Sequence, residues 1–115
     1  MESMIRELYF SDEFWAFYHK QQDKVKCKFD YVISIIRKEK VITTKFVKHL
    51  ENTDLYEMRI SVGSNEYRTV LFAVDHDNII LATKIFVLNA FLKKSEKDYR
   101  KQIEIAENIL GGFVK

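Results

Sequence analysis

Proline is absent from the 115 residues, cysteine occurs once and glycine only three times. The single cysteine, Cys27, excludes an internal disulfide and a zinc site built from several cysteines, and it fits a reducing compartment. The chain has no proline-rich or glycine-rich tract, and 47% of its residues are hydrophobic, which excludes the disordered and collagen-like classes. We therefore expect one compact domain over residues 1–115.

Long hydrophobic runs are also missing. The longest, residues 79–86, is interrupted by Thr83 and Lys84 and is far shorter than the roughly 20 residues that a transmembrane helix needs. The first ten residues include three charged side chains and lack the features of a secretory signal. We expect a cytoplasmic protein with no membrane association.

Metal chemistry has little support in the sequence. The three histidines, His19, His49 and His76, are widely spaced, and none forms a ligand pair with Cys27. Neither a metal nor a cofactor is expected.

Charge is distributed unevenly, although its sum is only +2. Residues 20–48 contain nine basic and three acidic residues, which favours a solvated helix surface. Residues 84–101 contain six basic and two acidic residues, between an expected strand and an expected helix start, where backbone N–H groups add to the positive field. This second block is the better candidate for a phosphate site. Its basic residues are Lys84, Lys93, Lys94, Lys97, Arg100 and Lys101.

The first half of the chain has the 3.6-residue period of helices. Residues 4–10 are read as a short strand, and Ser11 is a typical N-cap for a helix that contains Tyr18. A second, amphipathic helix is predicted by the spacing of Phe29, Val32, Ile33 and Ile36. Residues 46–50 are expected to add one further helical turn.

The second half changes to the two-residue period of strands. Apolar and polar residues alternate over 56–62, and residues 63–65 supply a turn into a second strand over 66–74. Residues 79–88 are apolar on both faces and predict a central third strand.

A last helix is predicted from a capping box that begins at Ser95, and Gly111-Gly112 is expected to end it. The predicted fold is α+β: a curved antiparallel β-sheet with an N-terminal helical hairpin and a C-terminal helix.

Two arginines lie on the predicted hairpin. A turn whose loop is Ser64-Asn65, or residues 63–66, makes Arg59 and Arg68 diagonal neighbours on one face, about 7 to 8 Å apart. One interpretation is structural, with Glu57 bridging them in a surface ion pair. The other is an anion held between the two guanidinium groups.

The third strand offers further groups to the same face. A turn that pairs Val74 with Ile79 places Ile85 beside Arg68, and Asn89, Phe91 and Lys93 then point with Ile85. In that arrangement Arg59, Arg68 and Lys93 converge around Phe91, which supplies cations for a phosphate and an aromatic ring for a base.

Several motifs occur together in order: Leu55-Tyr56-Glu57-Met58-Arg59, Glu66-Tyr67-Arg68, Phe91-Leu92-Lys93-Lys94 and Glu104-Ile105-Ala106. In this order and spacing the sequence resembles the RelE/ParE toxin superfamily, in particular its HigB and phage Gp49-like branch. The resemblance implies a type II toxin that cleaves mRNA in the ribosome without a metal. It also implies inhibition by an antitoxin, here a HigA-like helix-turn-helix protein, with operator DNA contacted only through the toxin–antitoxin complex.

The resemblance also implies roles for residues. Arg59 and Arg68 match the motif arginines, and we expect Arg68, Lys93 and Arg59 to be catalytic. Binding of RNA or the ribosome is expected from Lys94, Phe91, Lys97 and Lys84. Asn89 stands where relatives often have histidine, so no histidine acid or base can be assigned there, and Asn89 is a candidate site residue. Tyr99 stands where many relatives have proline, but a tyrosine near this point assists catalysis in some RelE-like toxins, so Tyr99 is a further candidate.

Two rival functions remain open. A ParE-like toxin inhibits DNA gyrase and needs no RNA site, so it tolerates changes at Arg68 and Lys93. An inactive module retains only operon repression within a complex. The Lys93-Lys94 match favours the nuclease over both.

Overall fold

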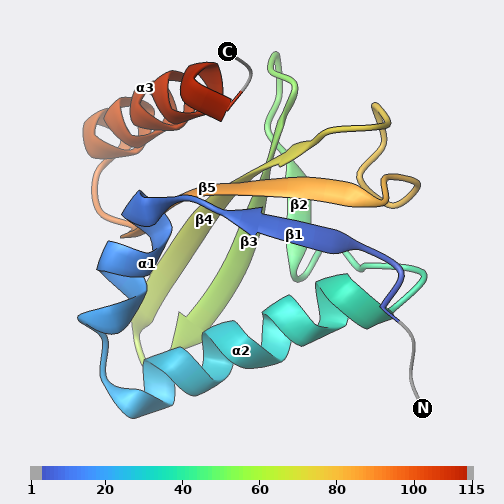
Figure 1. Cartoon of the computed structure of the whole chain (residues 1–115). Coiled ribbons are helices and arrows are strands. Elements are labelled where there is room, and N and C mark those ends of the chain that lie inside the picture. Colours follow the sequence, from blue (N-terminus) through green and yellow to red (C-terminus); the bar gives the residue numbers. More distant parts are fainter. Residues whose placement is uncertain (1–3, 114–115) are drawn as a thin grey trace.

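The computed structural model describes residues 4–113 as five strands in one sheet with helices on both faces. Figure 1 shows α3 on one face of the sheet and α1 and α2 on the other. The elements in chain order are β1 (Glu7–Phe10), α1 (Asp12–His19), α2 (Asp23–Lys38), β2 (Val47–His49), β3 (Leu55–Val62), β4 (Asn65–Ala73), β5 (Lys84–Leu92) and α3 (Glu96–Phe113). The α+β prediction is therefore confirmed.

The sheet runs in the order β1-β5-β4-β3-β2. Neighbouring strands are antiparallel except β1, which runs parallel to β5 along the first edge. The sheet is thus mixed rather than wholly antiparallel. The β2 strand at the other edge was missed, because Phe46, Val47 and Leu50 also have helical spacing.

The first and last helices begin where the sequence predicts. The backbone N–H of Phe14 donates to the Ser11 hydroxyl at 3.0 Å, which caps α1. The N–H of Asp98 donates to the Ser95 hydroxyl at 3.1 Å, which caps α3. The predicted stop at Gly111-Gly112 is wrong, because α3 continues through both glycines to Phe113.

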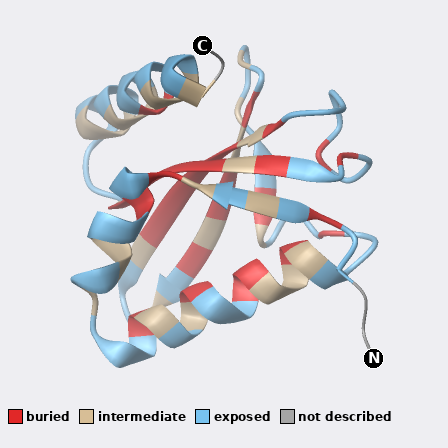
Figure 2. Ribbon diagram, viewed as in Figure 1, coloured by how far each residue is buried: buried red, intermediate tan, exposed pale blue. Residues whose placement is uncertain are grey.

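The core has two parts, one on each face of the sheet (Figure 2). The larger part joins α1 and α2 to the sheet through side chains such as Phe14, Phe29 and Leu71. The smaller part lies under α3 and includes Val70, Leu88 and Ala106. None of the helices within residues 4–113 has both the length and the apolar character that crossing a bilayer requires.

The β3–β4 hairpin turns through two residues, Gly63 and Ser64, because Val62 pairs with Asn65. Gly63 has φ +61°, a conformation that glycine adopts without a steric penalty. The loop is therefore shifted by one residue from the expected Ser64-Asn65, and the partner of each β3 residue on β4 is two residues earlier than expected.

A β-bulge in β5 changes the face on which its later side chains lie. Thr69 pairs with Ala90 and Leu71 pairs with Val87, so two residues of β5 stand opposite Val70 alone. The predicted third strand, 79–88, is also displaced, since β5 begins at Lys84 and ends at Leu92. Sequence periodicity carries no signal for the bulge.

Arg6 joins the start of the chain to two distant segments. Its side chain is only 2% exposed and donates five hydrogen bonds of 2.6 to 3.3 Å to main-chain carbonyls. These carbonyls belong to Ile36, Glu39, Lys40, Ile79 and Ile80. Arg6 therefore holds the end of α2 and the loop before β5 together.

Candidate functional site

Arg59 and Arg68 lie directly opposite each other on β3 and β4. The predicted diagonal placement is wrong because of the one-residue shift in the turn, but the two arginines do share a face. Phe91 stands opposite Arg68 on the other side, in β5. The expected neighbour, Ile85, pairs with Ala73 instead and lies in the core under α1 and α2.

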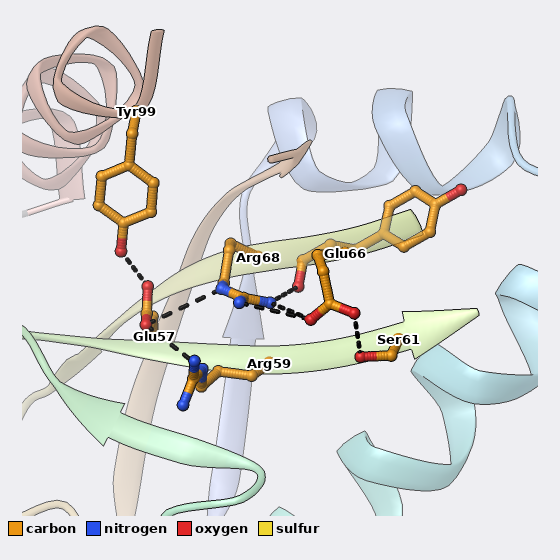
Figure 3. Close-up of polar contacts among 7 residues, drawn as sticks. Glu57, Arg59, Ser61, Glu66, Arg68 and Tyr99 are labelled. Atoms are coloured by element: carbon orange, nitrogen blue, oxygen red, sulfur yellow. Dashed lines mark hydrogen bonds and ion pairs between the residues drawn. The ribbon is translucent and has the colours of Figure 1, made fainter. Parts of the chain in front are cut away.

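Glu57 lies between the two arginines (Figure 3). Its Oε1 atom is 3.6 Å from Arg59 Nε and 3.9 Å from Arg68 Nε, and the residue is 6% exposed. The Tyr99 hydroxyl, from the first turns of α3, donates a hydrogen bond to Glu57 Oε2. Within the described chain neither Nε has a hydrogen-bond partner, so the ion pairs hold the arginines without saturating them.

The other side of Arg68 is occupied by a second carboxylate. Glu66 Oε1 is 3.4 Å from Nη1 and 3.5 Å from Nη2 of Arg68, while Ser61 donates to Glu66 Oε2 at 2.5 Å. The hydrogen bond from Ser61 and the charge of Arg68 lower the pKa of Glu66. The Glu66 side chain is 45% exposed, whereas that of Arg68 is 3% exposed. Glu66 therefore stands where an anion from solvent would reach Arg68.

Charges in this network balance, because Arg59 and Arg68 face Glu57 and Glu66. Excess positive charge comes from the segment between β5 and α3, where Lys93, Lys94 and Lys97 are exposed. The Lys93 N–H donates to the Glu66 carbonyl at 2.8 Å, which fixes this segment beside the network.

Tyr99 connects the lysines with the network. The Lys93 Nζ atom lies 5.8 Å from the centre of the Tyr99 ring, within the range of a cation–π interaction. Burial, followed by the hydrogen bond to Glu57, raises the pKa of Tyr99 above its usual value of 10.0. Its hydroxyl is therefore protonated at neutral pH and is a weaker acid than the hydroxyl of a free tyrosine.

Phe91 and Asn89 have packing roles in this structure. Phe91 is 5% exposed and contacts Tyr99 edge to face at 5.7 Å between ring centres, so it offers no free ring face to a base. The Asn89 side-chain amide donates to the carbonyl and Oε1 of Gln102, both at 3.1 Å. Both residues fasten α3 to β5.

Lys84 lies away from the other candidates. It begins β5 and pairs with Glu7, whereas Lys93 follows the last residue of the same strand. Nine residues of strand separate these ends by about 26 Å. The structure therefore does not bring Lys84 to the arginine network, and its contact with RNA or the ribosome stays a prediction.

Sequence reasoning missed Glu66 and Ser61 as members of the network. With the correct turn, Ser61 faces Glu66, and Glu66 is two residues from Arg68 on the same face. An acidic residue two positions before an arginine on the same strand was the sequence signal that could have identified Glu66. Among residues 4–113, no group of three histidine, cysteine or acidic side chains is arranged to hold a metal ion.

Comparisons with known proteins agree with this fold. The family described as "Phage derived protein Gp49-like (DUF891)" matches residues 16–110. Among solved structures, a variant of E. coli toxin RelE with two arginines replaced by alanine, in the free state, is similar with a TM-score of 0.58. That alignment covers 94% of this chain and 97% of the RelE chain at 18% sequence identity. No curated protein sequence matches the chain.

Proposed function

Because the chain belongs to the family of phage-derived Gp49-like proteins and has the fold of RelE, we propose that it is a toxin that cleaves mRNA on the ribosome. The observation that carries the proposal is the pair formed by Arg59 and Arg68, directly opposite each other with unsaturated Nε atoms. Arginine keeps its charge and matches the geometry of a phosphate group.

RNA supplies its own nucleophile for such a reaction. The 2′-oxygen loses its proton and attacks the adjacent phosphorus, and the 5′-oxygen leaves and takes up a proton, which yields a cyclic 2′,3′-phosphate and a 5′-hydroxyl. The protein must align these atoms and stabilise charge on the phosphate. No metal is required for either task.

The scissile phosphate takes the place of the Glu66 carboxylate in this proposal. Two guanidinium nitrogens of Arg68 already face one oxygen of Glu66, and the partly exposed Glu66 side chain can move into solvent. Lys93 contacts the same phosphate from the edge of the network, while Arg59 and Lys94 position the RNA. Tyr99, protonated at neutral pH, is placed to donate a proton once it leaves Glu57.

The partners in this proposal are the ribosome with its mRNA and an inhibitory antitoxin of the HigA type. The exposed lysines Lys94 and Lys97 would meet RNA phosphates, since they lie next to the network and project into solvent. Translation takes place in the cytoplasm, so the protein would act there.

The test is inducible expression of the chain followed by mapping of mRNA 5′ ends. Wild type is expected to produce breaks within translated codons, and Arg68→Ala to reduce them by about 100-fold or more, since one charge-stabilising group is lost. Arg37→Ala, which removes an arginine in the last turn of α2 whose guanidinium lies over the Phe10 ring, is the matched control and should cleave like wild type.

Three outcomes are decisive. Unchanged cleavage by a folded Arg68→Ala protein rejects the assignment of Arg68. Growth arrest with intact mRNA rejects the nuclease and points to gyrase instead. Absence of arrest with wild type rejects the toxin function.

A further inference from the structure

We propose that Lys28, Tyr31, Lys45 and Phe46 form a binding surface for a nucleotide that flanks the cleaved phosphate of single-stranded RNA. We call these four residues the aromatic shelf. The inference rests on the proposed function in one respect, namely that the RNA phosphate lies at Arg59 and Arg68. The shelf lies in the first basic block, which the sequence alone assigned to a solvated helix surface.

Each aromatic ring of the shelf is paired with a lysine. Lys28 Nζ is 5.7 Å from the centre of the Tyr31 ring, and Lys45 Nζ is 5.5 Å from that of Phe46. The two rings meet edge to face, 6.2 Å apart, although 15 residues separate them in sequence. Tyr31 is 57% exposed, which is more than packing against the core would leave.

Three residues of the shelf share a cavity with Arg59, one member of the arginine pair. A cavity of about 120 Å³ is lined by Lys28, Lys45, Phe46, Arg59, Ile60, Ser61 and Glu66. The N–H of Arg59 donates to the Phe46 carbonyl at 2.7 Å, which fixes the shelf to β3. A chain that occupies the cavity therefore reaches Arg59 and the exposed side of Glu66.

Alternating cations and aromatic rings are the elements that bind single-stranded nucleic acids. Bases stack on aromatic rings, and lysines neutralise the phosphates between them. The cations facing the cavity are Lys28, Lys45 and Arg59, and the acidic group is Glu66, whose carboxylate is engaged by Ser61 and Arg68. Positive charge therefore exceeds negative charge at the mouth of the cavity, as an anionic chain requires.

The first measurement compares two labelled probes by fluorescence anisotropy: a single-stranded RNA hexamer of adenosine and a hexamer of the same backbone without bases. Wild type is expected to bind the adenosine hexamer about fivefold or more tightly, the smallest effect that one stacked base gives. Tyr31→Leu should remove most of this preference. Tyr9→Leu, on the distant edge strand β1, is the matched aromatic control and should retain it.

The second measurement is the salt dependence of the same binding. Lys28→Ala and Lys45→Ala should each lower the slope of log K against log salt concentration by about 0.7, the value for one lost phosphate contact to a single strand. Lys40→Ala, an exposed lysine beyond the far end of α2, should leave the slope unchanged. Thermal unfolding of each variant separates loss of binding from loss of folding.

These outcomes separate the shelf from the proposed nuclease. Equal binding of the two hexamers by wild type, or an unchanged preference in folded Tyr31→Leu, overturns the shelf even if Arg68→Ala abolishes mRNA cleavage. Loss of the preference in Tyr31→Leu supports the shelf, and absence of mRNA cleavage by wild type would then reject the nuclease alone.

Discussion

Arg6 and Arg68 are both almost completely buried, but their surroundings differ. Arg6 donates five hydrogen bonds and has no carboxylate partner within residues 4–113, whereas Arg68 approaches two carboxylates at 3.4 and 3.9 Å and has an Nε without a hydrogen bond. A saturated guanidinium has no capacity left for a ligand. An unsaturated one can exchange a carboxylate for a phosphate, and this difference is what the proposed function requires of Arg68 and not of Arg6.

The end of α2 explains why Arg6 needs no carboxylate. Three of its five acceptors are carbonyls at or just beyond the C-terminus of α2, where the helix dipole is negative and the last carbonyls lack helical partners. The cation therefore caps the helix. Within the described part of the chain Arg68 donates to no helix carbonyl, and its charge is balanced by the carboxylates of Glu57 and Glu66.

The largest expected effect is on stability, from Arg6→Met. Removing the guanidinium leaves buried carbonyls without donors, at about 1 to 3 kcal/mol for each that water cannot reach. We expect the free energy of unfolding to fall by about 3 to 5 kcal/mol in urea denaturation. Arg6→Lys, which keeps the charge but not the fork of five donors, should recover only part of the loss. A loss below 1 kcal/mol would contradict the structural role.

Arg68→Met is expected to affect mRNA cleavage more than stability, the reverse of Arg6→Met. Glu57 keeps Arg59 and Tyr99 as partners, so the free energy of unfolding should fall by only about 2 kcal/mol. Cleavage of mRNA should be lost, since the phosphate loses its ligand. If Arg68→Met unfolds the protein as strongly as Arg6→Met, the distinction between the two arginines fails.

Glu57→Gln tests whether the arginine pair binds anions. The amide still accepts a hydrogen bond from Tyr99, but two guanidinium groups lose the charge between them, and we expect a loss of about 1.5 kcal/mol. Sulfate should then restore the melting temperature more than sodium chloride of equal ionic strength. If sulfate and sodium chloride raise the melting temperature of Glu57→Gln equally, the substitution has opened no anion site. The same conclusion follows if sulfate raises the melting temperature of wild type as much as that of Glu57→Gln.

The smallest effect concerns Tyr99→Phe and depends on pH. Because burial and Glu57 raise the pKa of Tyr99, its contribution to stability is present below pH 10 and is lost as the pH rises through the folded-state pKa. Wild type should be more stable than Tyr99→Phe by about 1 kcal/mol at pH 8, with the difference shrinking above pH 10. A constant difference up to pH 11 would contradict this.

Tyr18 is the matched control for that measurement. Burial and its hydrogen bond to Asp30 raise the pKa of Tyr18 to about 12, but it lies on α1, outside the arginine network. Tyr18→Phe should show a similar dependence on pH without any change in mRNA cleavage.

Local features of the sequence predicted most of the fold. Ser11 and Ser95 start their helices because a hydroxyl can satisfy a free backbone N–H within three residues, a rule that needs no tertiary context. That Arg59 and Arg68 share a sheet face could also be predicted from the local sequence, because any turn with an even number of loop residues puts them on one face. Their direct pairing depends on which two residues form the turn, and glycine at its first position decided that.

The parts that could not be predicted depend on contacts distant in sequence. Glu57 and Tyr99 are 42 residues apart, and the position of Phe91 depends on a bulge set by packing between β4 and β5. Arg6 was read only as a charge near the N-terminus, because its five acceptors are backbone groups that leave no pattern in the sequence. These contacts can be seen only in the tertiary structure.

The pairing of β1 with β5 has a consequence for synthesis of the protein. Glu7 pairs with Lys84, so the strand made first must wait 77 residues for its partner, and closing so long a loop carries an entropic cost. The β3–β4 hairpin can form earlier from neighbouring residues, but it then has an unpaired edge until β5 emerges from the ribosome. The arginines are thus among the first groups to meet and among the last to be enclosed, which makes the growing chain vulnerable to aggregation during that interval.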